Sequence, residues 1–272
     1  YPKRYNFNNV TETNYYENAP YYESHSVIKN QNIWSDPPDI SEKALKERKI
    51  WLNNKLISLK DAGIKFFTNG KPMTPIKTGI LGRGLLGRFG PNHAADPIIT
   101  RFNFWNFQIE FISVLRNDTN EWAIPGGMVD PGEKVTATLK REFTEEAASK
   151  CNKNIIDKIF ENETILYAGP TYGDPRTTDN AWIETYVAHY HINFNLWSKL
   201  KLSNQETENQ SVKWISCNNK KLYGDHAKFI KLAKQNVINK MFMFSLKLFV
   251  NISIYALLIT IILYINPFYN KK

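Results

Sequence analysis

The feature that most constrains this chain is the stretch from Gly126 to Ser149, GGMVDPGEKVTATLKREFTEEAAS. Its two leading glycines have no Cβ, so the backbone there can bend tightly or lie against a ligand. The Pro-Gly pair that follows is typical of a tight turn. Apolar side chains then recur at every fourth position, at Val135, Leu139, Phe143 and Ala147. This spacing predicts a helix from Lys134 to Ala148 that buries one stripe against a core.

The same predicted helix carries glutamates beside its apolar stripe. Glu142 and Glu146 are four residues apart and project from one side of the helix, and Glu145 lies nearby. Arg141 precedes Glu145 by four residues and can pair with it. Carboxylates gathered on one face repel each other unless a cation lies between them, and Mg²⁺ prefers oxygen ligands. Taken alone, the glutamates fit either a divalent metal site or a solvated acidic end of a helix.

The complete spacing resembles the Nudix box, the signature of hydrolases that act on nucleoside diphosphates linked to another group. The pattern is G-x5-E-x7-R-E-φ-x-E-E, with φ apolar, and it is filled by Gly127, Glu133, Arg141, Glu142, Phe143, Glu145 and Glu146. Ala148 and Ser149 differ mildly from the small and aliphatic residues that usually close the box, and neither is a candidate ligand. The resemblance implies an α/β/α sheet sandwich. It also implies ligands for Mg²⁺, or for Mn²⁺ as a substitute: Glu142, Glu146, Glu145 and the carbonyl oxygen of Gly126. Arg141 and Glu133 would brace that site.

A wider resemblance connects the chain with the mitochondrial-type family of ADP-ribose pyrophosphatases. Three segments carry it: GRGLLGRFGPNHAADPIITR, EWAIPGGMVDPGEK and DPRTTDNAW, which start at Gly82, Glu121 and Asp174. It covers most of residues 1–240, weakly before Leu81. The resemblance implies that Asp174 and Arg176 contact the terminal ribose and a phosphate, since carboxylates accept from hydroxyls and guanidinium groups fork onto phosphate oxygens. The remaining implied substrate contacts are Tyr223, His226 and His93.

Alternatives stay open for these residues and for the activity. An Asp-Pro-Arg sequence alone fits a surface turn, and a lone histidine on a helix is more often structural. The predicted reaction is Mg²⁺-dependent hydrolysis of ADP-ribose to AMP and ribose 5-phosphate, with Glu145 and Asp174 both possible as the base. One alternative is a domain that binds ADP-ribose without cleaving it, as in a related domain fused to an ADP-ribose-gated cation channel. That domain has a degraded R-E-φ step, whereas Arg141-Glu142-Phe143 is intact here. A further alternative activity is hydrolysis of a different nucleoside diphosphate sugar.

The rest of the chain is expected to divide into distinct parts. Residues 1–80, rich in Tyr, Asn and Pro, predict a small, mostly β N-terminal domain with a helix from Ser41 to Ile57, capped by Ser41. Residues 81–240 mix strands and helices, which is typical of an α/β or α+β fold. Strands are expected at 97–101, 107–116, 164–168, 182–190 and 212–215, and a further helix at 226–238.

The last part, Leu248 to Ile265, has 18 residues without a charge, LFVNISIYALLITIILYI. That length is near the lower limit for a helix that crosses a bilayer. Lys240 and Lys247 precede it, and further lysines follow it. The segment predicts a transmembrane helix that anchors the chain, with residues 1–240 on the cytoplasmic side. A packed terminal helix is the alternative.

Composition narrows the partners and the compartment. The formal net charge is +9, but Lys and Arg are scattered, so no nucleic-acid partner is expected, and a small polyanionic substrate is favoured. Cys151 and Cys217 have no metal-binding spacing and fit reduced thiols in an intracellular protein. The family resemblance also allows a mitochondrial location.

Overall fold

The centre of the fold is a mixed β-sheet. The computed structural model describes residues 2–3, 6, 15, 17–31, 33–52, 55–130, 132–171, 173–203, 209–219 and 221–269. Among these residues, five strands of the sheet follow the order β11 (Asn209–Ser216), β6 (Gln108–Arg116), β5 (Gly90–Asn103), β10 (Ala181–His191) and β9 (Thr164–Pro170). The short strands β7 (Trp122–Ala123) and β8 (Gly127–Met128) pair with β6 and β5. β5 and β10 run parallel, from Gly90 beside Ala181 to Thr100 beside His191.

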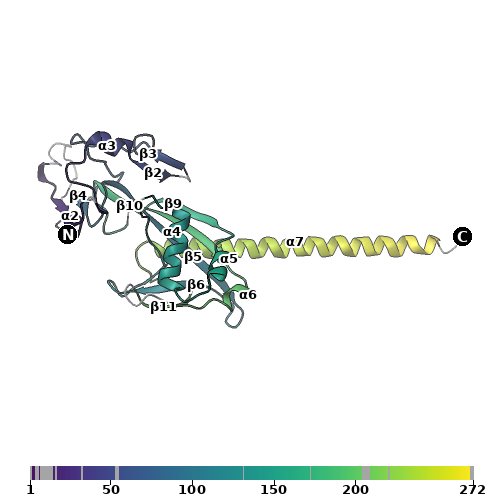
Figure 1. The fold of residues 1–272 in the computed structure, drawn as a ribbon. Coiled ribbons are helices and arrows are strands. Elements are labelled where there is room, and N and C mark those ends of the chain that lie inside the picture. Colours follow the sequence, from purple (N-terminus) through teal and green to yellow (C-terminus); the bar gives the residue numbers. More distant parts are fainter. Residues whose placement is uncertain are drawn as a thin grey trace.

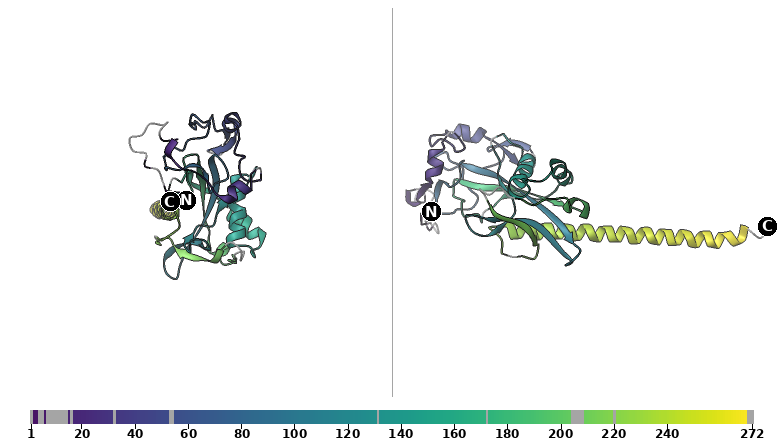
Figure 2. Two further views of the ribbon diagram at one scale, coloured as in Figure 1. Left: turned by 90° about the vertical axis from the view of Figure 1, so that its left-hand side faces the viewer. Right: turned by 60° about the horizontal axis from the view of Figure 1, so that its bottom comes forward.

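Helices cover both faces of this sheet (Figures 1 and 2). α4 (Val135–Ala147) and α5 (Lys153–Ile159) lie on one face, and the first turns of α7 (His226–Tyr269) lie on the other. Successive side chains of a strand point to opposite faces. Ile99 of β5 therefore shares a core with Phe143 of α4, whereas Ile98 shares one with Phe229 of α7. The result is the α/β/α sandwich expected from the sequence.

α4 has the buried stripe that its spacing predicted. Leu139, Phe143 and Ala147 are fully buried, and Lys134 is the N-cap residue. Because this stripe fixes the rotation of the helix, the neighbouring face, with Glu142, is turned toward the loop before α4. The stripe thus positions the glutamates.

The region before β5 is held together across a long stretch of sequence. β1 (Tyr21–Glu23) pairs in parallel with β4 (Leu81–Gly84), and α2 (His25–Lys29) follows β1. The guanidinium group of Arg83 is fully buried and pairs with Glu23 at 2.6 Å. These contacts join residues on both sides of the predicted boundary at residue 80, and the division into domains remains a prediction.

The helix predicted from Ser41 to Ile57 is wrong in its length. Ser41 does cap α3, its hydroxyl accepting from the Ala44 amide at 3.2 Å, but α3 ends at Glu47 (Glu42–Glu47). Arg48 takes an extended conformation, with its guanidinium group bonded to Asp36 at 2.6 Å and to the Phe89 carbonyl at 2.9 Å. The chain then forms an antiparallel hairpin of β2 (Lys49–Leu52) and β3 (Lys55–Ser58). The chain thus leaves α3 at Arg48, whose side chain bonds to residues distant in sequence.

The C-terminal segment continues α7 without a break. The helix predicted at 226–238 and the apolar segment from Leu248 form one helix from His226 to Tyr269. Its early residues Phe229 and Ala233 are buried, whereas its apolar side chains from Met241 to Ile262 are exposed. Among the described residues, this is the one helix long and apolar enough to cross a membrane, by length and composition. The part of α7 from Met241 onward projects far from the sheet (Figure 1), so this part is not packed on the domain.

α6 (Phe194–Trp197) is a short helix after β10. It lies at the end of the domain from which α7 leaves (Figure 1).

Candidate functional site

The loop before α4 lies directly against the glutamates of the helix. A Cβ on Gly127 would be 2.4 Å from the carboxyl group of Glu142, which is 7% exposed. The backbone amide of Gly126 donates to Glu146 Oε2 at 2.8 Å. A Cβ on Gly126 would also be 2.4 Å from Asp96 Oδ1. The two glycines are therefore required because carboxylates occupy the space that side chains would fill.

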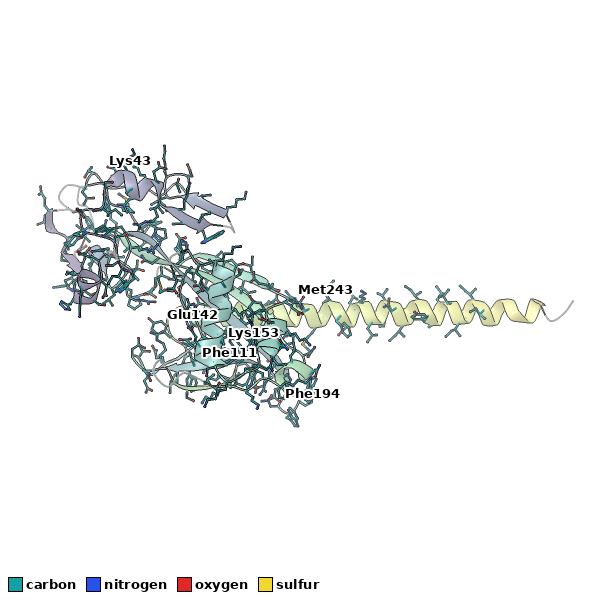
Figure 3. The ribbon with its side chains drawn as sticks, in the orientation of Figure 1. Lys43, Phe111, Glu142, Lys153, Phe194 and Met243 are labelled. Carbon is teal, nitrogen blue, oxygen red and sulfur yellow. The ribbon has the colours of Figure 1, made fainter. Side chains whose placement is uncertain are left out.

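Arg141 bonds to three glutamates of the cluster, one of which, Glu142, is labelled in Figure 3. Its guanidinium group binds both oxygens of Glu133, at 3.1 and 3.0 Å, and donates to Glu142 at 2.7 Å and to Glu145 at 3.2 Å. The hydrogen bond from Arg141 holds the pKa of Glu133 below its usual range. The same contact raises the pKa of Arg141. One guanidinium group thus offsets part of the repulsion among three carboxylates, and the predicted pairing with Glu145 is present.

The predicted metal ligands have suitable chemistry, although they do not form a ready-made cluster. Glu142 and Glu146 approach the adjacent residues Gly127 and Gly126, so both flank the same stretch of backbone. Carboxylate and carbonyl oxygens are the ligands that Mg²⁺ prefers. Within the described part of the chain, no three His, Cys, Asp or Glu side chains are grouped as a metal site. Glu142 and Glu145 both accept from Arg141, at 2.7 and 3.2 Å, and the ligand set remains a prediction.

A cleft beside the glycine loop collects most of the predicted substrate residues. Gly126, Asp174, Arg176, Tyr223 and His226 line it together. Arg176 forks onto the carboxylate of Asp174, with contacts of 2.9 and 2.7 Å. This pair holds the guanidinium group at the wall of the cleft, within reach of an anionic ligand.

His226, also in this cleft, is held as a neutral ring. Its Nδ1 accepts a hydrogen bond from the Ile124 amide at 2.8 Å, so the proton of the neutral ring is on Nε2. Burial lowers the pKa of His226 to about 4. The Tyr223 ring meets it edge to face at 5.7 Å, and Arg116 stacks over Tyr223 at 4.3 Å. This end of the cleft thus offers aromatic surface and a neutral donor.

Asp96 is a cleft residue that the sequence analysis missed. Its carboxyl group is 9% exposed, accepts a hydrogen bond from the Thr185 hydroxyl and lies beside Gly126. Burial raises its pKa to about 6. A charged residue inside the apolar strand sequence AADPII was the available signal, since a buried carboxylate requires partners.

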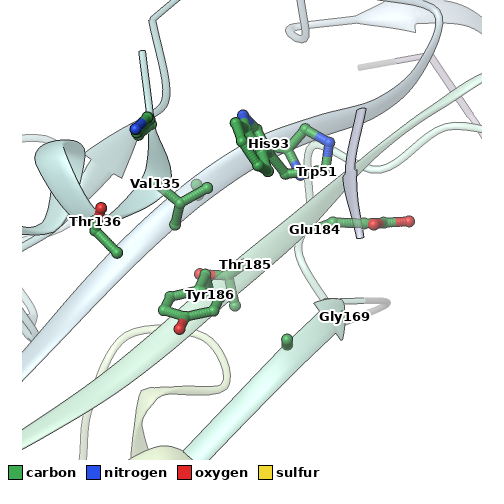
Figure 4. A pocket seen from close by; sticks show the side chains of 11 residues that line it. Trp51, His93, Val135, Thr136, Gly169, Glu184, Thr185 and Tyr186 are labelled. Carbon is green, nitrogen blue, oxygen red and sulfur yellow. The ribbon is translucent and has the colours of Figure 1, made fainter. Parts of the chain in front are cut away.

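His93 lies apart from Tyr223 and His226. It lines a separate cavity with Trp51 of β2, Glu184 and Tyr186 of β10, and the start of α4 (Figure 4). His93 and Trp51 also line an adjoining cavity, which reaches Arg176. Burial lowers the pKa of His93 to about 4, and no hydrogen-bond partner for its buried Nε2 is present among the described residues. Trp51 was not predicted as a cleft residue, because contact between β2 and this region depends on the tertiary fold.

Comparison with known proteins identifies related chains. The family model described as NUDIX domain matches residues 106–233. A Caenorhabditis elegans protein named as nudix hydrolase 6 is 42% identical over 209 residues, which are 75% of this chain and 79% of that protein. The mitochondrial ADP-ribose pyrophosphatase of Rattus norvegicus is 39% identical over 225 residues, which are 74% of this chain and 64% of that protein.

A channel is also similar to part of the chain. The Nematostella vectensis transient receptor potential cation channel subfamily M member-like 2 is 45% identical over 142 residues, which are 45% of this chain and 9% of the channel.

Proposed function

Because this chain belongs to the Nudix hydrolase family, we propose that it is an enzyme that hydrolyses ADP-ribose to AMP and ribose 5-phosphate in the presence of Mg²⁺. Two contacts carry the proposal. Glu142 lies against the backbone of Gly127, and Glu146 accepts a hydrogen bond from the backbone amide of Gly126. They set two carboxylates along one short stretch of chain, beside a cleft with an arginine. That combination suits a diphosphate and a divalent cation.

In this proposal the metal site consists of Glu142, Glu146 and the Gly126 carbonyl, with Glu145 contributing. Mg²⁺ bound there supplies charge neutralisation for the diphosphate oxygens and lowers the pKa of water. Arg141 and Glu133 hold the glutamates in place, since one guanidinium group bonds to both Glu133 and Glu142. The reaction adds one water across the P–O–P bond, so one phosphate oxygen of the products comes from solvent.

The cleft residues position the substrate. Arg176, held by Asp174, faces the phosphates, and Asp174 remains able to accept from a ribose hydroxyl. Tyr223 and the neutral His226 provide a surface for the nucleoside. His93 has a different place in this proposal, because it lines the adjoining cavities rather than this cleft. It would contact a part of the substrate that extends beyond Arg176.

The proposal is tested by following AMP formation from ADP-ribose with the full chain in detergent. AMP should appear with Mg²⁺ or Mn²⁺, disappear with a chelator, and form more slowly from other nucleoside diphosphate sugars. Glu142→Gln should abolish most activity, whereas Glu161→Gln, a matched change of an exposed glutamate, should not. Reaction in ¹⁸O-labelled water would show which phosphorus is attacked. Tight binding of ADP-ribose without AMP formation would instead make the chain a binding domain, the role suggested by the similarity to a channel.

We also propose that α7 anchors the enzyme in an intracellular membrane. The support is its long exposed apolar surface, and the mitochondrial name of the rat relative makes a mitochondrial membrane a specific candidate. The catalytic residues all precede this surface in sequence. Extraction of membranes with carbonate tests the anchor, because a spanning helix stays in the pellet and a peripheral protein is released.

A further inference from the structure

The turn between β5 and β6 displays aromatic side chains toward solvent. Phe104, Trp105 and Phe107 are 57%, 73% and 79% exposed. Phe107 has a φ of 54°, which a bulky side chain rarely adopts. Asn103 and Asn106 both donate to Glu110 at 3.0 Å and hold the turn in this shape. The exposed rings therefore belong to an ordered turn.

These rings continue onto α6. Trp105 meets Trp197 at 5.8 Å, and Trp197 meets Phe194, which is 52% exposed, at 5.0 Å. We call Phe104, Trp105, Phe107 and Phe194 the aromatic end face. A groove beside it is lined by Phe104, Phe194 and Met241, and Met241 belongs to α7. The aromatic end face thus adjoins α7 at the point where the helix leaves the domain, the end at which Figure 3 labels Phe194 and Met243.

The helix becomes apolar immediately at that point. Lys240 is still bonded to the domain, through Thr164 at 3.0 Å. The next residues, 241–246, are MFMFSL, and their large apolar side chains are 44–70% exposed. At a rise of 1.5 Å per residue, Lys247 lies only about 10 Å beyond Lys240 along the helix. If a bilayer surrounds this part of α7, a lysine so close to the bilayer surface can extend its amine to the lipid headgroups. No polar spacer separates the domain from the apolar helix, so a bilayer that takes up α7 begins at the edge of the domain.

We propose that the aromatic end face inserts into the headgroup region of this bilayer as a second membrane contact beside α7. This inference rests on the proposed membrane anchor and is independent of the proposed reaction. Aromatic rings are enriched at membrane interfaces, and amphipathic elements enter them by about 5–10 Å. Lys158 lines the same groove, and Lys199 and Lys201 follow α6 in sequence. Their charge complements anionic lipid headgroups.

A second contact fixes the orientation of the domain, because a single helix leaves it free to rotate about the helix axis. β2, β3 and α3 lie at the end of the domain away from the exit of α7 (Figures 1 and 2). β2 contributes Trp51 to the cavities beside the candidate site. With the aromatic end face on the membrane, this part of the enzyme faces the aqueous phase.

The test uses the full chain in vesicles of phosphatidylcholine and phosphatidylserine, with lipids brominated at shallow or deep acyl positions. Bromine quenches nearby tryptophans, and the chain has seven. We expect shallow bromine to quench the wild type and most of that quenching to be lost in Trp105→Phe. Trp34→Phe, which removes a 39% exposed tryptophan of the N-terminal region, should leave the quenching unchanged. Trp105 is highly exposed, so the variant should fold and form AMP at the wild-type rate.

Equal quenching in the wild type and Trp105→Phe would overturn the inference. Loss of self-association in Trp105→Phe, with unchanged quenching, would assign the aromatic end face to a second copy of the chain and also overturn it. If the full chain does not float with vesicles, the anchor and the second contact both fail. AMP formation measured in the same samples reports separately on the proposed reaction.

Discussion

Gly127→Ala is the sharpest test of the contact between the glycine loop and α4. The added Cβ would lie 2.4 Å from Glu142, whereas ordinary van der Waals contact begins at 3.4 Å. The loop or the carboxyl group must therefore move by 1.0 Å, the difference between these distances. Gly127 is not among the glycines with positive φ, so the substitution acts through this contact and not through backbone strain.

Displacement of a reacting group by about 1 Å costs about 100-fold in rate, so we expect kcat for ADP-ribose to fall by about this factor. The atoms that the new Cβ meets are the far end of the Glu142 side chain, which can shift at little cost in stability, so Tm should stay close to that of the wild type. The assay is AMP formation at saturating ADP-ribose and Mg²⁺, with thermal unfolding of the same sample in detergent. Activity should be lost at temperatures where the variant is still folded.

Gly132→Ala is the matched control in the same loop. A Cβ there meets no atom within 4 Å, but its φ is +82°. The control should lose about 1–2 kcal/mol of stability through the backbone and keep a kcat close to that of the wild type. Wild-type kcat in Gly127→Ala, or equal losses of kcat in both variants, would refute the idea that this contact positions Glu142.

Four further outcomes are expected. Glu142→Gln and Glu146→Gln should each lower kcat by about 100-fold or more, as loss of one strong electrostatic contact does; near wild-type rates in both would exclude the proposed metal face. Arg176→Ala should raise KM for ADP-ribose about tenfold, or 1.4 kcal/mol, with a smaller change in kcat, measured by initial rates. Burial lowers the pKa of His189 from 6.5 to about 4. The free energy of unfolding should therefore fall by roughly 3 kcal/mol as the pH drops from 6.5 toward 4. An equally steep loss of Tm with falling pH in His189→Gln would contradict this. Truncation after Lys240 should give a soluble, active enzyme, and an unfolded product on circular dichroism would show that the apolar part of α7 is needed for folding.

The parts of the fold that sequence patterns predicted correctly depend on local spacing. The helix containing Leu139 and Phe143 follows from a repeat of four residues, and the pairing of Arg141 with Glu145 follows from the same geometry. The helix at Ser41 was overextended because short apolar runs such as KIWL fit a helix or a strand. α7 was divided in two because charged residues interrupt its apolar pattern, although they do not interrupt its backbone hydrogen bonds.

The parts of the candidate site that were missed depend on partners far away in sequence. Asp96 is bonded to Thr185, 89 residues later. His226 was predicted as a site residue, but the amide that holds its ring lies 102 residues earlier. Nothing in the residues around either position predicts these partners. The role of Gly127 was predicted from its lack of a side chain, but the structure was needed to identify Glu142 as the group that occupies the space.

The segment Asp179–Asn180 gives the chain a particular order of folding. The Asp179 side chain accepts from the Tyr15 hydroxyl and the Thr78 amide, and the Asn180 side chain accepts from the Gly82 amide at 2.8 Å. The groups that complete the hydrogen bonds of residues before β5 are therefore synthesised about a hundred residues later. Thr78 and Asp179, for example, are 101 residues apart. The N-terminal region cannot finish folding while it is the only part of the chain outside the ribosome. We therefore expect the N-terminal region to become native together with the sheet, after Asp179 and Asn180 have been synthesised.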